Sequence, residues 1–209
     1  MPATKNLTIE QGETFALTVR WETDKPEVYK AITAIAKSGP VRITAPSHGL
    51  VDGWRAAIEG VKGMVEINAA HSPPRCNEYH EVTYVDANTI DLNAINTAAV
   101  DENGDDLYGT YTSGGYLRYN SAVDMTGYTP KMVVLDRVGG TVLASTEAAD
   151  SPLNIITATA DNTAKTINIS ISVANVNALT WTRGVYDLSM VSTTSTTKLL
   201  EGTITVSKD

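Results

Sequence analysis

The chain has 209 residues, a formal net charge of −8, 42% hydrophobic residues and 19% charged residues, which is the composition of a folded protein. The acidic balance excludes a general binder of nucleic acid, because such binding needs clustered lysines and arginines to replace counterions, and no segment approaches the roughly 20 apolar residues that span a bilayer. The single cysteine, Cys76, excludes an internal disulfide and any multi-cysteine zinc module.

The N-terminal segment predicts two strands. In residues 15–21 every second side chain is large and apolar, and this period of two marks a strand with one face in a core. Leu7 and Ile9 predict a shorter strand before a turn at Gln11 and Gly12. Residues 1–10 lack the charged-then-apolar layout of a secretion signal.

The last third of the chain follows the same pattern. Alternation predicts strands at residues 166–173, 184–191 and 199–206, and residues 175–179 fit one helical turn. Residues 131–143 predict a hairpin with two glycines at its turn. Short strands at this spacing are typical of an antiparallel sandwich.

The middle of the chain predicts short strands joined by tight turns, as in a small barrel. These strands are expected at residues 40–44, 54–60, 79–85, 89–92 and 113–117. Residues 27–37 are the exception, because Val28, Ala31, Ile32 and Ile35 fall at near-helical spacing. A short helix and an irregular linker both fit that segment.

Both ends of the chain resemble phage tail and baseplate proteins, and more narrowly the N-terminal domain of upper baseplate proteins of the lactococcal type. The likeness rests on residues 11–21, on Asp124-Met125-Thr126-Gly127-Tyr128-Thr129, and on a closing pattern at residues 184–188 and 200–206. In that family the second motif follows the first after a short turn. Here it comes about a hundred residues late.

The interrupting segment has a likeness of its own. Residues 40–44, 48–50, 58–64, 85–92 and 112–115 resemble the small β-barrel first recognised as the first catalytic-cysteine half-domain of ubiquitin-activating E1 enzymes, copies of which occur in phage structural proteins. The two resemblances imply an all-β protein. They predict an antiparallel, Ig-like β-sandwich at residues 1–25 and 119–209 that is interrupted by an inserted small β-barrel at residues 26–118.

Cys76 is the first candidate for chemistry. A catalytic thiol needs a base or a positive field, and His71, Arg75 and His80 lie near it in the sequence. The E1 half-domain does not itself carry that enzyme's nucleophile, so we expect no enzyme here. His71, Cys76 and His80 offer only three zinc ligands, and we expect a plain loop and no cofactor.

An acidic run from Asp101 to Asp106 offers a weak calcium site through Asp101, Asn103 and Asp105, because carboxylate oxygens suit calcium. The run lacks the terminal glutamate and the flanking helices of an EF-hand, and its Asn-Gly pair is also a common hairpin turn. His48 belongs to the barrel signature, and we expect only a structural role for it.

Aromatic residues are the candidates for recognition. Trp54, Tyr108, Tyr111 and Tyr116 are candidates for contact with a partner protein or a glycan. Trp21 ends an alternating apolar face, so we expect it to pack in the core.

These patterns predict a virion structural protein of a tailed phage, made in the host cytoplasm and placed in the tail, baseplate or neck. It would be a non-enzymatic adaptor that binds other phage structural proteins and forms a homo-oligomer in a symmetric ring, without nucleic acid or membrane. Two alternatives stay open. One is a capsid decoration or head-fibre protein, and the other is a carbohydrate-binding receptor module.

Overall fold

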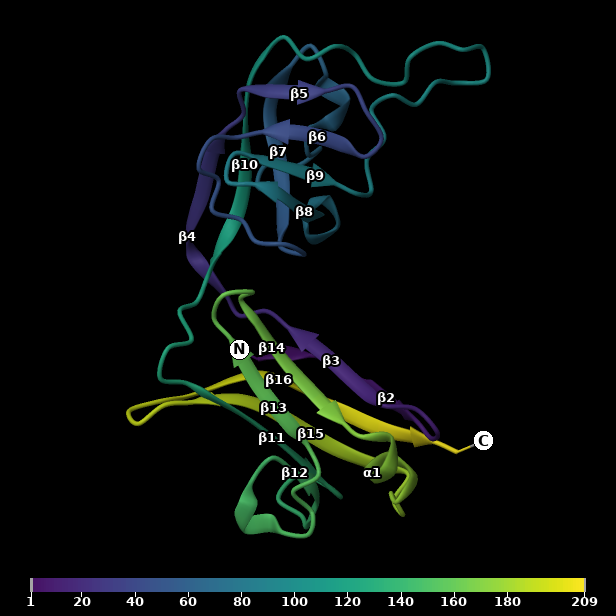
Figure 1. Ribbon diagram of the computed structural model, residues 1–209, viewed down its shortest axis with the longest axis vertical. Helices are drawn as coiled ribbons and strands as arrows, with labels where there is room; N and C mark the ends of the chain where they lie inside the picture. The colour runs from purple at the N-terminus through teal and green to yellow at the C-terminus, as the bar shows by residue number, and fades with distance from the viewer. Residues whose placement is uncertain (1, 209) are drawn as a thin grey trace. The chain divides into compact units, whose positions relative to one another are not determined.

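The chain folds into two compact units (Figure 1). The computed structural model describes residues 2–208, with the backbone alone at positions 24–26. Unit 1 contains residues 2–21 and 123–208, and unit 2 contains residues 22–122. The sequence places these boundaries at 25/26 and 118/119. The structure places them further out, because the first and last strands of unit 2 stay paired as far as Glu22 and Ala122.

Unit 1 is a β-sandwich of two sheets. The larger sheet has the order β1-β16-β15-β11-β12, with β2 also beside β16. Its strands are β1 (Ala3–Thr4), β2 (Leu7–Glu10), β11 (Thr129–Leu135), β12 (Val142–Ser145), β15 (Arg183–Val191) and β16 (Thr196–Ser207). The smaller sheet, of order β13-β14-β3, contains β13 (Thr157–Asp161), β14 (Thr166–Ile171) and β3 (Phe15–Val19).

The apolar alternation read from the sequence builds the core of unit 1. In β11 every second residue is buried, with Pro130, Met132 and Val134 facing inward. Strand β14 buries Ile167, Ile169 and Ile171 in the same core cluster, together with α1 (Val173–Asn177) through its Val176. The sandwich is not purely antiparallel as predicted, because β1 and β2 both pair with β16 in parallel.

The two ends of the chain meet at the carbonyl of Lys5. The Tyr186 hydroxyl donates a hydrogen bond of 2.7 Å to this oxygen. Gly202, which lies opposite Tyr186 in the β15–β16 pair, approaches the same carbonyl so closely that a Cβ atom would collide with it. Tyr186 and Gly202, which belong to the closing pattern of the sequence, therefore hold the N-terminal strands in place at Lys5. We call this contact the seat at Lys5.

The Asp124–Tyr128 motif lies where the chain re-enters unit 1, and its hydrogen bonds fix this segment. Asp124 accepts hydrogen bonds from the Thr126 amide (3.0 Å) and from the Asn162 side chain (2.6 Å), and the bonds from Thr126 lower the pKa of Asp124 to about 2. Gly127 adopts φ +77°, and Tyr128 packs edge-on against Trp21 with ring centroids 5.1 Å apart. Trp21 thus packs against the core of unit 1.

Unit 2 is one seven-stranded sheet of order β4-β10-β7-β8-β9-β6-β5. Its elements are β4 (Glu22–Ala31), β5 (Ala34–Ala36), β6 (Val41–Thr44), β7 (Arg55–Lys62), β8 (His80–Asp86), β9 (Thr89–Leu92), β10 (Ser113–Ala122), and the single-turn helices η1 (Val65–Ile67) and η2 (Cys76–Glu78). The sheet curls around one core (Figure 1). The pairing order ends at β4 and β5, so it does not close a ring, and the closed barrel stays a prediction.

The expectation of a helix or irregular linker at residues 27–37 is wrong. This segment forms most of β4 and all of β5. Strand β4 pairs along β10, with Val28 opposite Tyr119 and Ala31 opposite Tyr116. The strand partner supplies backbone hydrogen bonds that outweigh the local helical spacing.

His48 is completely buried and organises the turn before β7. Its Nδ1 accepts the Leu50 amide at 3.0 Å, and its Nε2 lies 2.8 Å from the Asp86 carbonyl, to which it donates. The Tyr119 hydroxyl donates to the His48 carbonyl, and burial raises the pKa of Tyr119 to about 12. His48 therefore has the structural role expected of it.

Within residues 2–208, no helix is long and apolar enough to cross a membrane.

Candidate functional site

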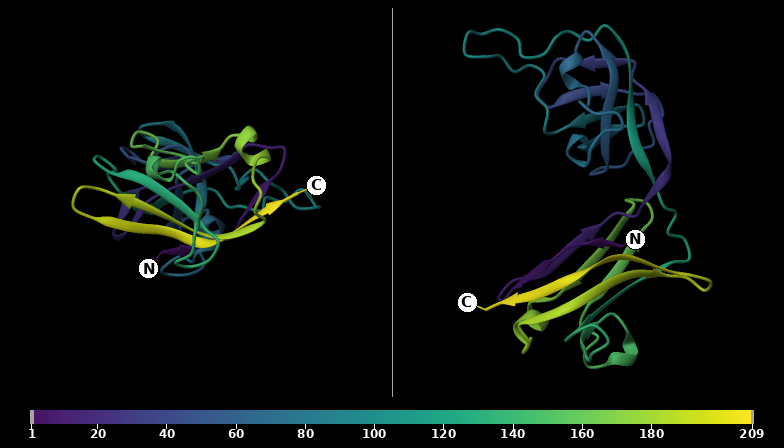
Figure 2. Two further views of the ribbon diagram at one scale, coloured as in Figure 1. Left: turned by 90° about the horizontal axis from the view of Figure 1, so that it is seen from below. Right: turned by 180° about the vertical axis from the view of Figure 1, so that it is seen from behind.

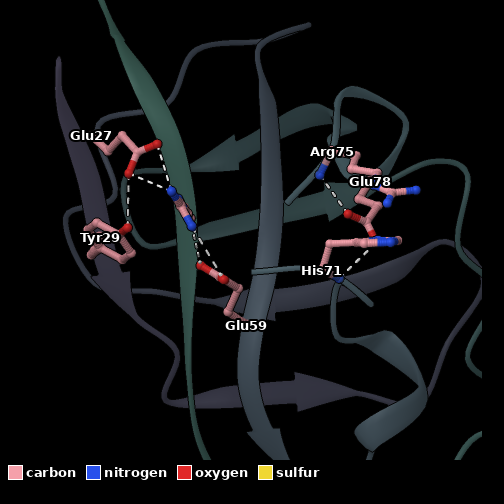
Figure 3. A network of polar contacts seen from close by, with 7 residues as sticks. Glu27, Tyr29, Glu59, His71, Arg75 and Glu78 are labelled. Carbon is pink, nitrogen blue, oxygen red and sulfur yellow. Dashed lines mark hydrogen bonds and ion pairs between the residues drawn. The ribbon is translucent and has the colours of Figure 1, made fainter. Parts of the chain in front are cut away.

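Glu78 closes the loop that contains Cys76 (Figure 3). Its Oε1 accepts the Ala70 amide at 2.7 Å and lies 3.0 Å from His71 Nδ1, and its Oε2 accepts the Arg75 amide at 2.6 Å. The bonds from Arg75 and then His71 lower the pKa of Glu78 to about 2. The carboxylate therefore stays charged and fixes the loop.

The proposed chemistry of Cys76 gains no geometric support. Cys76 is a free, exposed thiol, while His71 is engaged by Glu78. Over residues 2–208, no three His, Cys, Asp or Glu side chains converge in a way that would hold a metal ion. His71, Cys76 and His80 are thus not gathered as a zinc site.

A polar pocket of about 300 Å³ lies beside this loop. Its walls come from η1, the segment 68–80 and the start and end of the β9–β10 loop, and they include His80, Asn77 and Tyr108. Burial lowers the pKa of His80 and so favours its neutral ring. In the described part of the chain, neither the His80 ring nor the Tyr108 hydroxyl is hydrogen-bonded, so both can serve a ligand.

One wall of the pocket is held in place by a hydrogen bond. Glu66 of η1 accepts the Gly109 amide at 3.1 Å, which holds the end of the β9–β10 loop. The middle of that loop extends away from the sheet (Figures 1 and 2), whereas Ile95 and Thr97 near its start are buried. Two of the segments that line the pocket, the loop held by Glu78 and the end of the β9–β10 loop, are thus each fixed by a hydrogen-bonded carboxylate.

The calcium candidates form a closed turn in the middle of the β9–β10 loop. Asp101 Oδ1 accepts the amides of Asn103 (2.8 Å) and Asp105 (2.9 Å), and these bonds lower the pKa of Asp101. The neighbouring Asp106 is paired with Lys37. The Asp101 carboxylate is thus occupied by its own backbone, as in the hairpin-turn alternative.

The four aromatic candidates do not form one patch. Trp54 is only 2% exposed, and its indole N–H donates to the Asn120 carbonyl at 3.0 Å, so its assignment as a contact residue is wrong. The Tyr111 hydroxyl lies 3.1 Å from the carbonyl oxygens of Ile32 and Gly114 and joins strand ends. Tyr116 is half-exposed on β10 and Tyr108 lines the polar pocket.

A charged network that the sequence did not indicate lies on the β4–β10–β7 face (Figure 3). Arg118 donates to Glu27 at 2.7 and 2.8 Å and to Glu59 at 3.3 and 3.4 Å, and these carboxylates raise its pKa. Tyr29 donates to Glu27 at 3.0 Å, and its ring lies 5.4 Å from the Arg118 guanidinium. Register explains the cluster, because Tyr29 lies opposite Arg118 and Glu59 lies opposite Tyr116.

Neither models of known protein families nor curated proteins match this chain.

Proposed function

We propose that this chain is a non-enzymatic structural protein of a tailed-phage virion, an adaptor in the tail, baseplate or neck. It would act through contacts with other phage structural proteins and with copies of itself in a symmetric ring. The observation that carries the proposal is the role of the residues that resemble baseplate proteins. Tyr186 and Gly202 seat the N-terminal strands at Lys5, and the motif at residues 124–128 closes the sandwich.

The arrangement of the units supports an adaptor. Unit 1 is built from both ends of the chain, and unit 2 occupies a single connection of that sandwich. Each unit has its own core cluster. One unit can therefore hold a conserved docking geometry while the other varies its surface, and a ring multiplies modest contacts by avidity.

The test is localisation in an intact particle. Phage particles from a strain that carries the gene would be imaged by electron cryo-microscopy and labelled with an antibody against the chain. Density for the sandwich at the tail, baseplate or neck is the expected result. Label on the capsid would favour the decoration or head-fibre alternative, and purified particles that lack the protein would refute a virion role.

A second function, carbohydrate recognition, is favoured by the polar pocket of unit 2. A volume near 300 Å³ lies at the lower end of small-ligand pockets. A neutral imidazole, a phenol and an amide are donors and acceptors that suit the hydroxyls of a neutral sugar.

Glycan-array binding by the full chain tests this function. Tyr108→Ala and His80→Ala are each expected to abolish the signal. The matched control is Tyr116→Ala, which removes an exposed tyrosine that does not line the pocket. A signal that survives both pocket variants, or no signal on the array, contradicts carbohydrate recognition at this site.

A further inference from the structure

The polar pocket of unit 2 has only negative charges in its wall. Glu66 and Glu78 are its carboxylates, and no lysine or arginine of the described chain lines it. His80 adds no positive charge, because burial favours its neutral ring. A ligand with a carboxylate, sulfate or phosphate group would meet repulsion without a compensating cation. The pocket therefore selects against anionic sugars.

The two carboxylates differ in what they can still bind. Glu78 already accepts three backbone amides and lies against the His71 ring. Glu66 Oε2 accepts the Gly109 amide at 3.1 Å, whereas no partner of its Oε1 is found over residues 2–208. Because Glu66 is exposed, this second oxygen can accept a hydrogen bond from a ligand. An N–H or O–H group of the ligand thus has an ionised acceptor here.

Much of the remaining wall is aliphatic. Ile67 and Ile95 belong to the core cluster of unit 2, and Ala69, Ala70 and Ala94 complete this part of the wall. Sugar hydroxyls gain nothing from such a surface, whereas a methyl group is stabilised when it leaves water for it. The pocket therefore suits a ligand that combines a hydrogen-bond donor with a methyl group.

We propose that the ligand of this pocket is a neutral sugar with an acetamido group, an N-acetylhexosamine. This inference rests on the carbohydrate function proposed above and names the class of sugar. The acetamido N–H donates to Glu66 Oε1, its methyl group lies on the aliphatic wall, and its carbonyl oxygen accepts from the Asn77 side chain. His80 and Tyr108 remain for the ring hydroxyls.

The experiment is an NMR titration of the full chain with N-acetylglucosamine, N-acetylgalactosamine, glucose and glucuronic acid. Both N-acetylhexosamines are expected to bind at least about tenfold more tightly than glucose, which lacks one hydrogen bond and one buried methyl group. Glucuronic acid should not bind. In saturation-transfer difference spectra, the acetyl methyl protons should receive the largest share of the saturation.

Two variants test the assigned contacts. Glu66→Gln keeps a carbonyl oxygen for the Gly109 amide but presents an NH₂ donor to the ligand, so most of the preference for N-acetylglucosamine over glucose should disappear. Ala94→Phe fills the pocket from an exposed position and should abolish binding of every sugar. Glu102→Gln, at an exposed glutamate outside the pocket, is the matched control and should leave all affinities unchanged.

The possible failures can be told apart. Equal affinity for N-acetylglucosamine and glucose, with both lost in Ala94→Phe, overturns acetamido recognition and leaves carbohydrate recognition standing. A preference for N-acetylglucosamine that persists in Glu66→Gln overturns the assigned contact, and binding that persists in Ala94→Phe overturns the site. If none of the four sugars binds, the inference and the carbohydrate function both fall.

Discussion

Arg118 lies on the outer face of a sheet, yet its side chain is only 9% exposed. Glu27 and Glu59 hold it from the two neighbouring strands, and Tyr29 covers one side. The guanidinium is planar and forked, so it can bind two carboxylates at once. Arg118 therefore ties β4, β10 and β7 together across their polar face.

Removing this charge should destabilise unit 2. Arg118→Met leaves two carboxylates close together, and we expect a loss of about 2 kcal/mol, below the ~3–5 kcal/mol of a fully buried pair because both glutamates touch water. The measurement is urea unfolding of the full chain. Arg118→Lys should lose less, since it keeps the charge but not the fork. An Arg118→Met variant as stable as wild type would contradict a tying role.

The lowered pKa of Glu78 predicts that acid destabilises the loop that this carboxylate fixes. Its folded pKa of about 2 is depressed from an ordinary value of 4.5, so its contribution to stability is present above pH 4.5 and is lost as the pH falls toward 2. Between these values the unfolded chain binds a proton at Glu78 that the folded chain does not.

Glu78→Gln should remove that proton uptake and reduce the pH dependence of the unfolding free energy between pH 4.5 and 2, while Asp124 and Asp101 keep their share of it. Glu102→Gln, at an exposed glutamate for which no hydrogen bond is found among the described residues, is the control. Equal acid sensitivity in wild type and Glu78→Gln would show that the carboxylate does not fix the loop.

Single residues were the least predictable part of the site from sequence. The structural role of His48 follows from its turn, but its partner Tyr119 is 71 positions away. The Arg118 network depends on the register of three strands, which no local pattern reveals. Trp54 shows the converse, since it was a candidate for contact with a partner while its indole is buried with a backbone acceptor.

At the scale of elements, the seat at Lys5 explains why two strands from one end of the chain attach to strands from the other. A methyl group at Gly202 would strike the Lys5 carbonyl and push β1 away from β16. Gly202→Ala should therefore destabilise unit 1 by about 1–3 kcal/mol, the range for overpacking. Tyr186→Phe, which loses only the 2.7 Å bond, should cost about 0.5–1.5 kcal/mol.

Hydrogen exchange would check this prediction. In Gly202→Ala the amides of β2 should lose protection more than those of β14, which does not contact the seat. Uniform loss across the sandwich, or no loss of stability, would contradict it.

Period-two alternation was sufficient to predict most strands, because a strand with one buried face must alternate. This pattern failed where the apolar residues of a strand do not alternate between a buried and an exposed face. In β4 the apolar residues near its end continue into a turn, and their spacing imitates a helix. The parallel pairing of β1 and β2 was also invisible, since pairing direction depends on distant strands and leaves no local trace.

For the whole molecule, the point where the chain leaves and re-enters unit 1 should allow unit 2 to be removed without disturbing unit 1. The Val123 amide donates to the Trp21 carbonyl at 2.9 Å, as in the i to i+3 bond of a β-turn. Replacing residues 22–122 with Gly-Gly should complete such a turn, and unit 1 should unfold cooperatively, because its core cluster contains only its own residues.

Thermal unfolding followed by circular dichroism tests this design, with Met132→Asp in the shortened chain as the unfolded control, since Met132 is fully buried. The separate 22–122 segment should also fold. A shortened chain without a cooperative transition would show that the sandwich needs the second unit.

The parallel pairing of β2 with β16 also sets how the chain bears tension. When its two ends are pulled apart, neighbouring parallel strands slide past each other, so their backbone bonds are loaded together and not broken one by one. Unit 2 is inserted in the chain between β2 and β16, so it bears no tension until the bonds between these two strands break. In an assembly stretched along its axis, the sandwich would carry the load and shield the module it bears.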